Sequence, residues 1–198
     1  LFDFFQTGVY DKNREFILTS SPSMDILISS NLERLIYTIA GQDAQKDAEL
    51  MRQLNTEGRY EITPQMREKL SDFVGGYATE EETKEEIRTT YERTGYVMDT
   101  HTAVAAYVCA KYRKDTGDKT KCLVASTASP YKFARSVMTA IDEKYAAEDE
   151  MELIDELHKV SGTEIPRAIE EIRNAQIRHT RECDAEAMKD EVKEILGV

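Results

Sequence analysis

Three short polar motifs hold the side chains of this sequence that could do chemistry. The first, Thr19-Ser20-Ser21-Pro22-Ser23, gathers hydroxyl groups at the predicted start of a helix. Free backbone N–H groups at such a start favour an anion such as phosphate. Taken alone, residues of these types more often form an ordinary helix cap than an anion site.

The second and third motifs combine a carboxylate, an imidazole and further hydroxyls. Asp99-Thr-His-Thr-Ala103 places a capping aspartate before His101, which could contact a ligand or simply cap and pack. Ser126-Thr127-Ala128 follows a short apolar run, where a loop can present a hydroxyl to a cleft. A plain turn capped by Ser129 explains the third motif equally well.

Helices are the main elements predicted to position these motifs. Apolar residues at three- and four-residue spacing predict one helix from Met24 to Ile39, ended by Gly41. Thr79 and Glu82 have the spacing of a capping box. The predicted helices cover 24–39, about 44–54, 64–74 and 80–94, a segment from Asp99 through Tyr112, about 149–159, a segment after Pro166, and 184–196.

Lys121-Cys-Leu-Val-Ala125 is predicted to be a buried parallel strand, because it is short, apolar and bounded by turn residues. A helix is expected near Tyr131, and an extended stretch over 176–180. The order of strand, polar loop and helix is typical of the carboxyl edge of an α/β sheet, where such folds bind ligands.

Composition excludes several classes of protein. The 198 residues have a net charge of −12, which disfavours nucleic acid and anionic membranes as partners. No apolar run is long enough to span a membrane, and no signal peptide opens the chain. Cys109, Cys122 and Cys183 are widely spaced, so we expect reduced thiols in the cytoplasm, in preference to a disulfide or a metal site. Because the sequence opens with Leu1 and not with methionine, we expect it to be a fragment that starts inside a longer protein.

All three motifs resemble blocks of the threonine synthase family. Ser21-Pro-Ser-Met-Asp-Ile, continued by Ser30-Asn-Leu-Glu-Arg34, resembles its Ser/Thr-Pro-Ser-Met-Asp-Ile…Ser-Asn-Leu-Glu-Arg block. Asp99-Thr-His-Thr-Ala103 resembles Asp-Pro-His-Thr-Ala, with threonine in place of proline. The third motif, with Pro130, Lys132 and Phe133 after it, resembles Ser-Thr-Ala-His-Pro-x-Lys-Phe, with Ser129 in place of the histidine.

The resemblance implies a fold, a cofactor and a reaction. It implies the mostly helical C-terminal part of an α/β, fold-type II pyridoxal-phosphate enzyme (tryptophan synthase β-like), with an incomplete parallel sheet and inserted helices. Residues 1–42 and 96–198 would belong to the catalytic domain and 43–95 to an inserted helical subdomain. The family is a carbon–oxygen lyase that converts O-phospho-L-homoserine and water to L-threonine and phosphate, by γ-elimination and β-addition.

The resemblance also assigns site residues. Thr127, then Ser126, would bind the cofactor ring, together with His101, and substrate contacts would come from four residues: Ser21, Ser23, Asn31 and Arg34. No catalytic residue is expected in this chain, because no lysine stands in the family's Ser-Phe-Lys-Asp setting and Gly75-Gly76 is a poor phosphate cup. The expected partners are the N-terminal half of the same enzyme and a second copy in a homodimer, and the chain alone should be inactive.

Two alternatives stay open. One is another pyridoxal-phosphate enzyme catalysing β-elimination or β-replacement, against which the Ser-Met-Asp-Ile block argues. The other is a non-enzymatic helical interaction module, which the acidic helices of 43–95 and the missing lysine favour.

Overall fold

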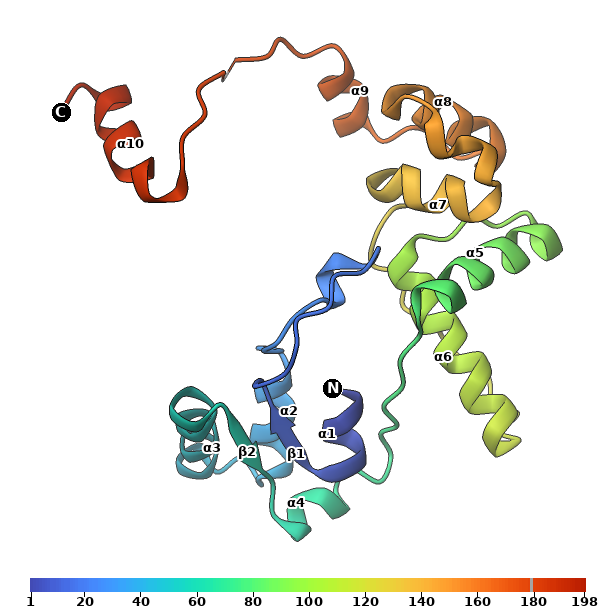
Figure 1. The fold of residues 1–198 in the computed structure, drawn as a ribbon. Coiled ribbons are helices and arrows are strands. Elements are labelled where there is room, and N and C mark those ends of the chain that lie inside the picture. Colours follow the sequence, from blue (N-terminus) through green and yellow to red (C-terminus); the bar gives the residue numbers. More distant parts are fainter. Residues whose placement is uncertain (179) are drawn as a thin grey trace. The chain divides into compact units, whose positions relative to one another are not determined.

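The computed structural model describes residues 1–178 and 180–198, which form two compact units (Figure 1). The first unit spans Leu1–Thr163 and the second Glu164–Val198. Both are mainly helical, as predicted. No helix in the described part of the chain is long and apolar enough to cross a membrane.

The N-terminal elements of the first unit pack around a small antiparallel sheet. They are α1 (Phe2–Thr7), β1 (Val9–Asp11), α2 (Leu32–Ile39), α3 (Ala44–Glu57), β2 (Arg59–Glu61) and α4 (Pro64–Glu68). The 3-10 helix η1 (Pro22–Met24) lies between β1 and α2 in the chain. Tyr10 of β1 lies opposite Tyr60 of β2, and their rings stack with centroids 5.5 Å apart. Phe4, Ile36 and Leu50 are buried in the same apolar core. This core therefore takes residues from both sides of the boundary predicted at residue 42, and the predicted domain division remains a prediction.

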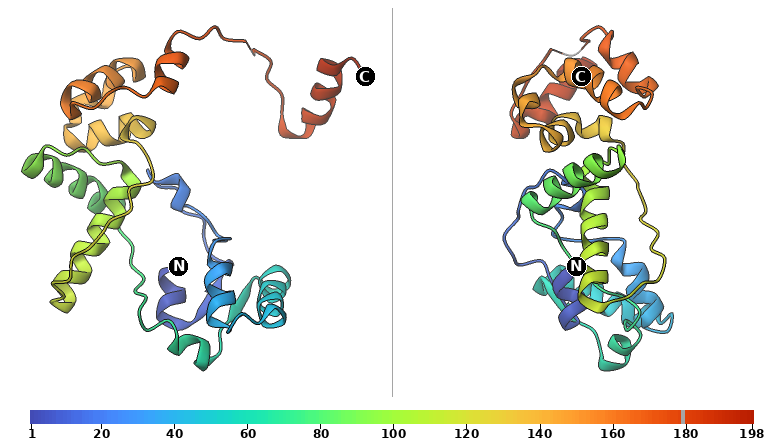
Figure 2. Two further views of the ribbon diagram at one scale, coloured as in Figure 1. Left: turned by 180° about the vertical axis from the view of Figure 1, so that it is seen from behind. Right: turned by 90° about the vertical axis from the view of Figure 1, so that its right-hand side faces the viewer.

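The remaining elements of the first unit are helices that pack on one another (Figure 2). They are α5 (Glu80–Thr94), α6 (Thr100–Thr116), η2 (Pro130–Phe133), α7 (Ala134–Ile141), η3 (Glu143–Ala147) and α8 (Glu150–Ser161). Helix α5 packs on α6 and α7, and α7 packs on α8. Ile87, Val137 and Leu157 are fully buried between them. Burial of each such side chain contributes about 1.5–3 kcal/mol to the stability of the fold. This packing therefore holds α6, and with it the start of that helix, in place.

The second unit contains α9 (Arg167–Arg173), η4 (Ala185–Ala187) and α10 (Met188–Leu196), in agreement with the predicted helices. Within it Arg181 forms ion pairs with Glu191 at 2.8 Å and Glu194 at 2.5 Å. Of the stretch predicted to be extended, residues 176–178 and 180 belong to no helix or strand, and His179 lies outside the described residues.

The predicted helix from 24 to 39 is correct only for its second half. Residues 25–31 are not helical, because side chains from elsewhere bond the backbone groups that a helix would use. The guanidinium of Arg14 donates to the carbonyl of Ile26 at 2.8 Å. The carboxylate of Asp25 turns to the preceding segment, where it accepts hydrogen bonds from the backbone and hydroxyl of Thr19, both at 2.7 Å. The hydroxyl of Tyr10 accepts from the backbone N–H of Ser29 at 2.7 Å and donates to the carbonyl of Leu27 at 3.0 Å.

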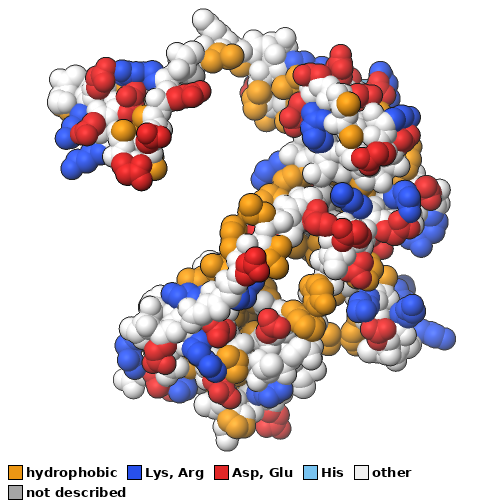
Figure 3. Space-filling view, viewed as in Figure 1, with side chains coloured by type: hydrophobic (Ala, Val, Ile, Leu, Met, Phe, Trp, Pro, Cys, Tyr) orange, Lys and Arg blue, Asp and Glu red, His pale blue; other side chains and the backbone are white. Residues whose placement is uncertain are grey.

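Apolar side chains consequently remain exposed along the stretches that join β1 to η1 and η1 to α2 (Figure 3). Met24 and Ile28 were predicted to lie on the apolar face of that helix, yet both are exposed, as is their neighbour Ile26. The predicted helix over 64–74 is also shorter than expected, since α4 ends at Glu68.

The predicted parallel strand at 121–125 is wrong. The segment forms no strand, and Leu123 in its middle is 95% exposed. A strand needs a paired neighbour for its backbone groups, and the sheet that the described residues form is the antiparallel β1–β2 pair. An apolar run in the sequence shows that a segment prefers burial, but it does not show whether another strand lies beside it to pair with.

Candidate cofactor and substrate site

Asp99 caps α6 and is the centre of the site. Its carboxylate is buried, and Oδ1 accepts hydrogen bonds from the backbone N–H groups of His101 at 2.9 Å and Thr102 at 3.3 Å. An aspartate at this position satisfies helix-start donors that otherwise have no partner, so the local sequence dictates this part of the geometry. Buried Val97 and Met98 hold the chain that enters the helix.

The ring of His101 joins the second motif to the first. Its Nδ1 lies 3.2 Å from Oδ1 of Asp99, and its Nε2 accepts the backbone N–H of Ser23 at 3.3 Å. An Nε2 that accepts must be unprotonated, so Nδ1 carries the proton and donates it to Asp99. The ring also packs on Phe133 with centroids 4.9 Å apart. Both ring nitrogens are thus used within the chain, and His101 positions Ser23.

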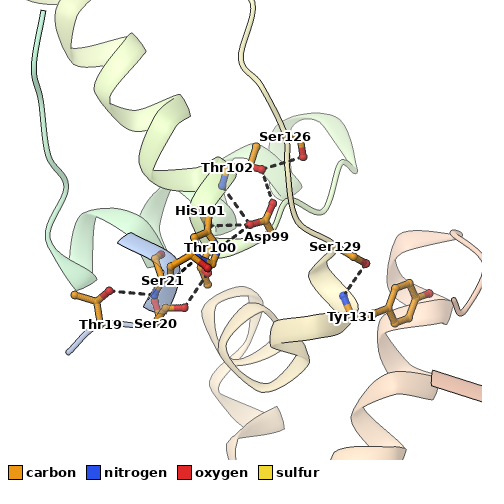
Figure 4. A network of polar contacts seen from close by, with 11 residues as sticks. Thr19, Ser20, Ser21, Asp99, Thr100, His101, Thr102, Ser126, Ser129 and Tyr131 are labelled. Atoms are coloured by element: carbon orange, nitrogen blue, oxygen red, sulfur yellow. Dashed lines mark hydrogen bonds and ion pairs between the residues drawn. The ribbon is translucent and has the colours of Figure 1, made fainter. Parts of the chain in front are cut away.

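A chain of hydroxyls joins Asp99 to the third motif (Figure 4). The Thr102 hydroxyl donates to Oδ2 of Asp99, and its oxygen lies 2.9 Å from the Ser126 hydroxyl. Because the single proton of Thr102 goes to the carboxylate, Ser126 must donate to Thr102. Ser126 is therefore anchored and has only acceptor capacity left.

Further contacts attach the first motif to the starts of α5 and α6. The Thr100 hydroxyl donates to the carbonyl of Ser20 at 2.9 Å, and the backbone N–H of Ser20 donates to Glu80 at 3.0 Å. The neighbouring Ser21 is 2% exposed, and its hydroxyl is a buried polar group without a hydrogen-bond partner among the described residues. A buried hydroxyl left in this way is costly in a folded protein unless a ligand or water completes it.

The structure brings together some of the predicted site residues and not others. Ser21, Ser23, His101 and Ser126 belong to or adjoin one hydrogen-bonded network. Thr127 is exposed, with no hydrogen bond between its hydroxyl and the rest of the described chain. Two further predicted residues, Asn31 and Arg34, are exposed at and after the start of α2, and the described residues give their side chains no hydrogen bond.

Sequence reasoning missed two contributors to the site, Glu80 and Thr100, and one contact outside it, that of Tyr107 with Glu82. Glu80 was visible only as a charge in the first turn of a surface helix, and Ser20, which it binds, lies 60 residues away. Thr100 was noted as a replacement for proline, and its hydroxyl turns out to hold Ser20. The Tyr107 hydroxyl donates to Glu82, which lowers the pKa of that carboxylate and raises the pKa of the tyrosine.

The described residues contain no group of three or more His, Cys, Asp or Glu side chains that could hold a metal ion. The site is built from hydroxyls, the carboxylates of Asp99 and Glu80, and one imidazole. Such a set can bind an anion or a polar organic group through hydrogen bonds.

Residues 102–183 match the family model described as threonine synthase, C-terminal. The matched range begins in the first turn of α6 and includes the Ser126 loop. This chain corresponds to the C-terminal portion of threonine synthases. Threonine synthase from Saccharomyces cerevisiae is 32% identical over 213 residues, covering 98% of this chain and 39% of the yeast protein. Threonine synthase-like 1 from Macaca fascicularis is 42% identical over 147 residues, covering 73% of this chain and 19% of that protein.

Solved threonine synthase structures share the fold of the chain. The yeast enzyme superposes with a TM-score of 0.75 at 26% identity, over 100% of this chain and 40% of the yeast chain. A pyridoxal-phosphate-bound threonine synthase from Brucella melitensis gives a TM-score of 0.63 at 33% identity, over 70% of this chain and 29% of that one. The chain thus spans about two fifths or less of the length of these relatives, and its fold is that of a portion of threonine synthase.

Proposed function

We propose that this chain forms one wall of the cofactor and substrate site of a pyridoxal-phosphate-dependent threonine synthase. The reaction is the conversion of O-phospho-L-homoserine and water to L-threonine and phosphate. The observation that carries the proposal is the single network through which Asp99, His101 and Thr102 hold Ser23 and Ser126. Ser23 is 78 residues from His101 in sequence, and Ser126 is 24 residues from Thr102. The first and third motifs are thereby both held at the start of α6.

The hydroxyls present fit pyridoxal phosphate on the side of its ring nitrogen. When bound, the cofactor supplies an electron-withdrawing ring that stabilises negative charge on substrate carbons. Ser126 is already engaged as a donor, whereas the hydroxyl of its neighbour Thr127 keeps its donor and acceptor capacity. Thr127 therefore binds the ring nitrogen, and Ser126 anchors the loop that presents it. A neutral hydroxyl at this position stabilises a protonated, positively charged ring nitrogen less than a carboxylate would.

The substrate side rests on the first motif and on α2. The buried Ser21 hydroxyl is available to donate to the phosphate or carboxylate of the substrate. His101 holds the backbone of Ser23 and so keeps the motif in place. Among the described residues, the side chains of Asn31 and Arg34 have no hydrogen-bond partner that a substrate would displace, and a guanidinium binds phosphate through paired hydrogen bonds. We assign no catalytic proton transfer to this chain, and we expect the isolated chain to be inactive.

The proposal is tested with a chimera in which this chain replaces the matching portion of the yeast threonine synthase. We expect release of phosphate from O-phosphohomoserine together with formation of threonine. Thr127→Ala should lower the rate about tenfold, since loss of one hydrogen bond worth about 1.4 kcal/mol in the transition state corresponds to that factor. Thr127→Ser keeps the hydroxyl and is the matched control, which should retain most of the activity.

Other outcomes would favour the alternatives. Phosphate release that yields a 2-oxo acid and ammonia, without threonine, would assign the protein to an elimination reaction of the same cofactor class. A folded chimera that binds no cofactor and releases no phosphate would overturn the enzyme assignment and favour an interaction module.

A further inference from the structure

Two cysteines that the site does not use face each other at close range. Cys109 lies in the middle of α6 and is half-buried, and Cys122 lies in the segment after α6 and is exposed. Their sulfur atoms are 2.6 Å apart, compared with about 2.0 Å in a disulfide. The sequence, in which they are thirteen residues apart, gave no sign of this contact.

The architecture of the segment sets this pairing. Helix α6 ends at Gly117 in the left-handed conformation, with φ 73°, and the chain then returns along the helix (Figure 2). The Arg113 side chain donates to the carbonyl of Asp118 at 3.4 Å, and at the far end of the segment Thr102 meets Ser126. Later residues of the segment therefore lie beside earlier residues of the helix, and the two sulfurs meet between these two contacts. Their proximity follows from an antiparallel course that is anchored on both sides.

The hydrogen bond between the two sulfurs makes them chemically unequal. Cys109 donates to the sulfur of Cys122, and this bond raises the pKa of the Cys109 thiol, with burial adding to the effect. Cys122 is the acceptor and is open to solvent, so small molecules reach its sulfur first. Nucleophilic attack requires the thiolate and access, which assigns the first step to Cys122.

We propose that Cys109 and Cys122 are a dithiol modification site, oxidised reversibly to an intrachain disulfide by small-molecule disulfides such as oxidised glutathione. Cys122 loses its proton and attacks one sulfur of the small disulfide, which breaks and releases one thiolate. Cys109 then loses its proton and attacks the Cys122 sulfur of this mixed disulfide, which releases the second thiolate. Two protein thiols are oxidised, one small disulfide is reduced to two thiols, and the departing thiolates take up the two protons.

The disulfide would tie the segment to α6 a few residues before Thr127. If the proposed function holds, oxidation fixes the stretch that carries the cofactor-binding hydroxyl and changes cofactor affinity. The disulfide itself does not depend on the proposed function, because its formation needs neither cofactor nor substrate. The two proposals can therefore fail separately.

The test incubates the whole reduced chain with oxidised glutathione, followed by alkylation, digestion without reductant and mass analysis. We expect a linked peptide pair joining Cys109 and Cys122, lost again on addition of excess reduced glutathione. Cys109→Ser should stop at glutathione on Cys122 and give no linked peptide. Cys183→Ser is the matched control, because it removes the third cysteine, and should form the linked peptide as the parent does.

The proposal is overturned if the parent chain carries glutathione on Cys109 and Cys122 separately without linkage. It is equally overturned if Cys183 is the main partner of either cysteine, or if both thiols remain alkylatable under conditions that modify Cys183. Circular dichroism of each variant checks that loss of linkage does not come from loss of the helical fold.

Discussion

Replacing Asp99 with alanine removes the group on which the site network converges. The change deletes the N-cap of α6, which costs about 1 kcal/mol. It also removes the carboxylate that accepts from the buried Thr102 hydroxyl and from the Nδ1–H of His101, at about 1 kcal/mol for each hydrogen bond. We therefore expect Asp99→Ala to lower the free energy of unfolding by about 3 kcal/mol.

Asp43→Ala is the matched control for this change. Asp43 caps α3 in the same way, accepting from the backbone N–H groups of Gln45 at 2.9 Å and Lys46 at 3.0 Å, but it is exposed and supports no further network. Its replacement should cost about 1 kcal/mol. The difference of about 2 kcal/mol between the two variants then measures the buried network beyond the cap.

Urea unfolding followed by circular dichroism gives both values, provided that the slope against urea is unchanged. Equal costs for the two variants would refute the reasoning, because they would mean that burial of the carboxylate and its partners adds nothing. Asp99→Asn keeps an acceptor for the helix start and should fall between the parent and Asp99→Ala.

Three further predictions follow from single contacts. Leu157→Ala should lower the free energy of unfolding by about 2–5 kcal/mol in urea, since the side chain is fully buried between α7 and α8. Thr79→Ala should cost about 1 kcal/mol in the same assay, since it breaks the capping box with Glu82. The pKa of Glu82 is lower in the folded chain than its unfolded value of about 4.3, so the ionised carboxylate stabilises the fold at any pH above that value. This stabilisation is lost as the pH falls through the lower, folded pKa. Tyr107→Phe removes the main cause of that lowering, so unfolding free energy measured from pH 6 to 3 should fall less steeply.

Each of these predictions has a contrary result. A loss below 1 kcal/mol for Leu157→Ala would mean that α8 is not packed on α7 in solution. No change for Thr79→Ala would place the start of α5 elsewhere. An unchanged acid dependence in Tyr107→Phe would show that the tyrosine does not hold the carboxylate of Glu82, and Glu82→Gln should then still flatten the curve.

Local sequence determined the ends of the helices. Thr79 with Glu82 starts α5 and Asp99 starts α6 where predicted, because caps act between residues a few positions apart. The helix expected from Met24 failed for the opposite reason. Tyr10, which bonds the backbone at Ser29, is nineteen residues away, and no local pattern reports such a contact.

The motifs of the site were also visible in the sequence, through their residue types and their resemblance to threonine synthases. Their meeting was not, because the contact of Ser23 with His101 depends on how α5 and α6 pack and where the intervening chain runs. The same holds for Cys109 and Cys122, which meet only because the chain turns at Gly117 and returns along α6. Caps and periodicity depend on neighbours in sequence, whereas these contacts and the unpaired segment at 121–125 depend on neighbours in space, and only the tertiary structure supplies those.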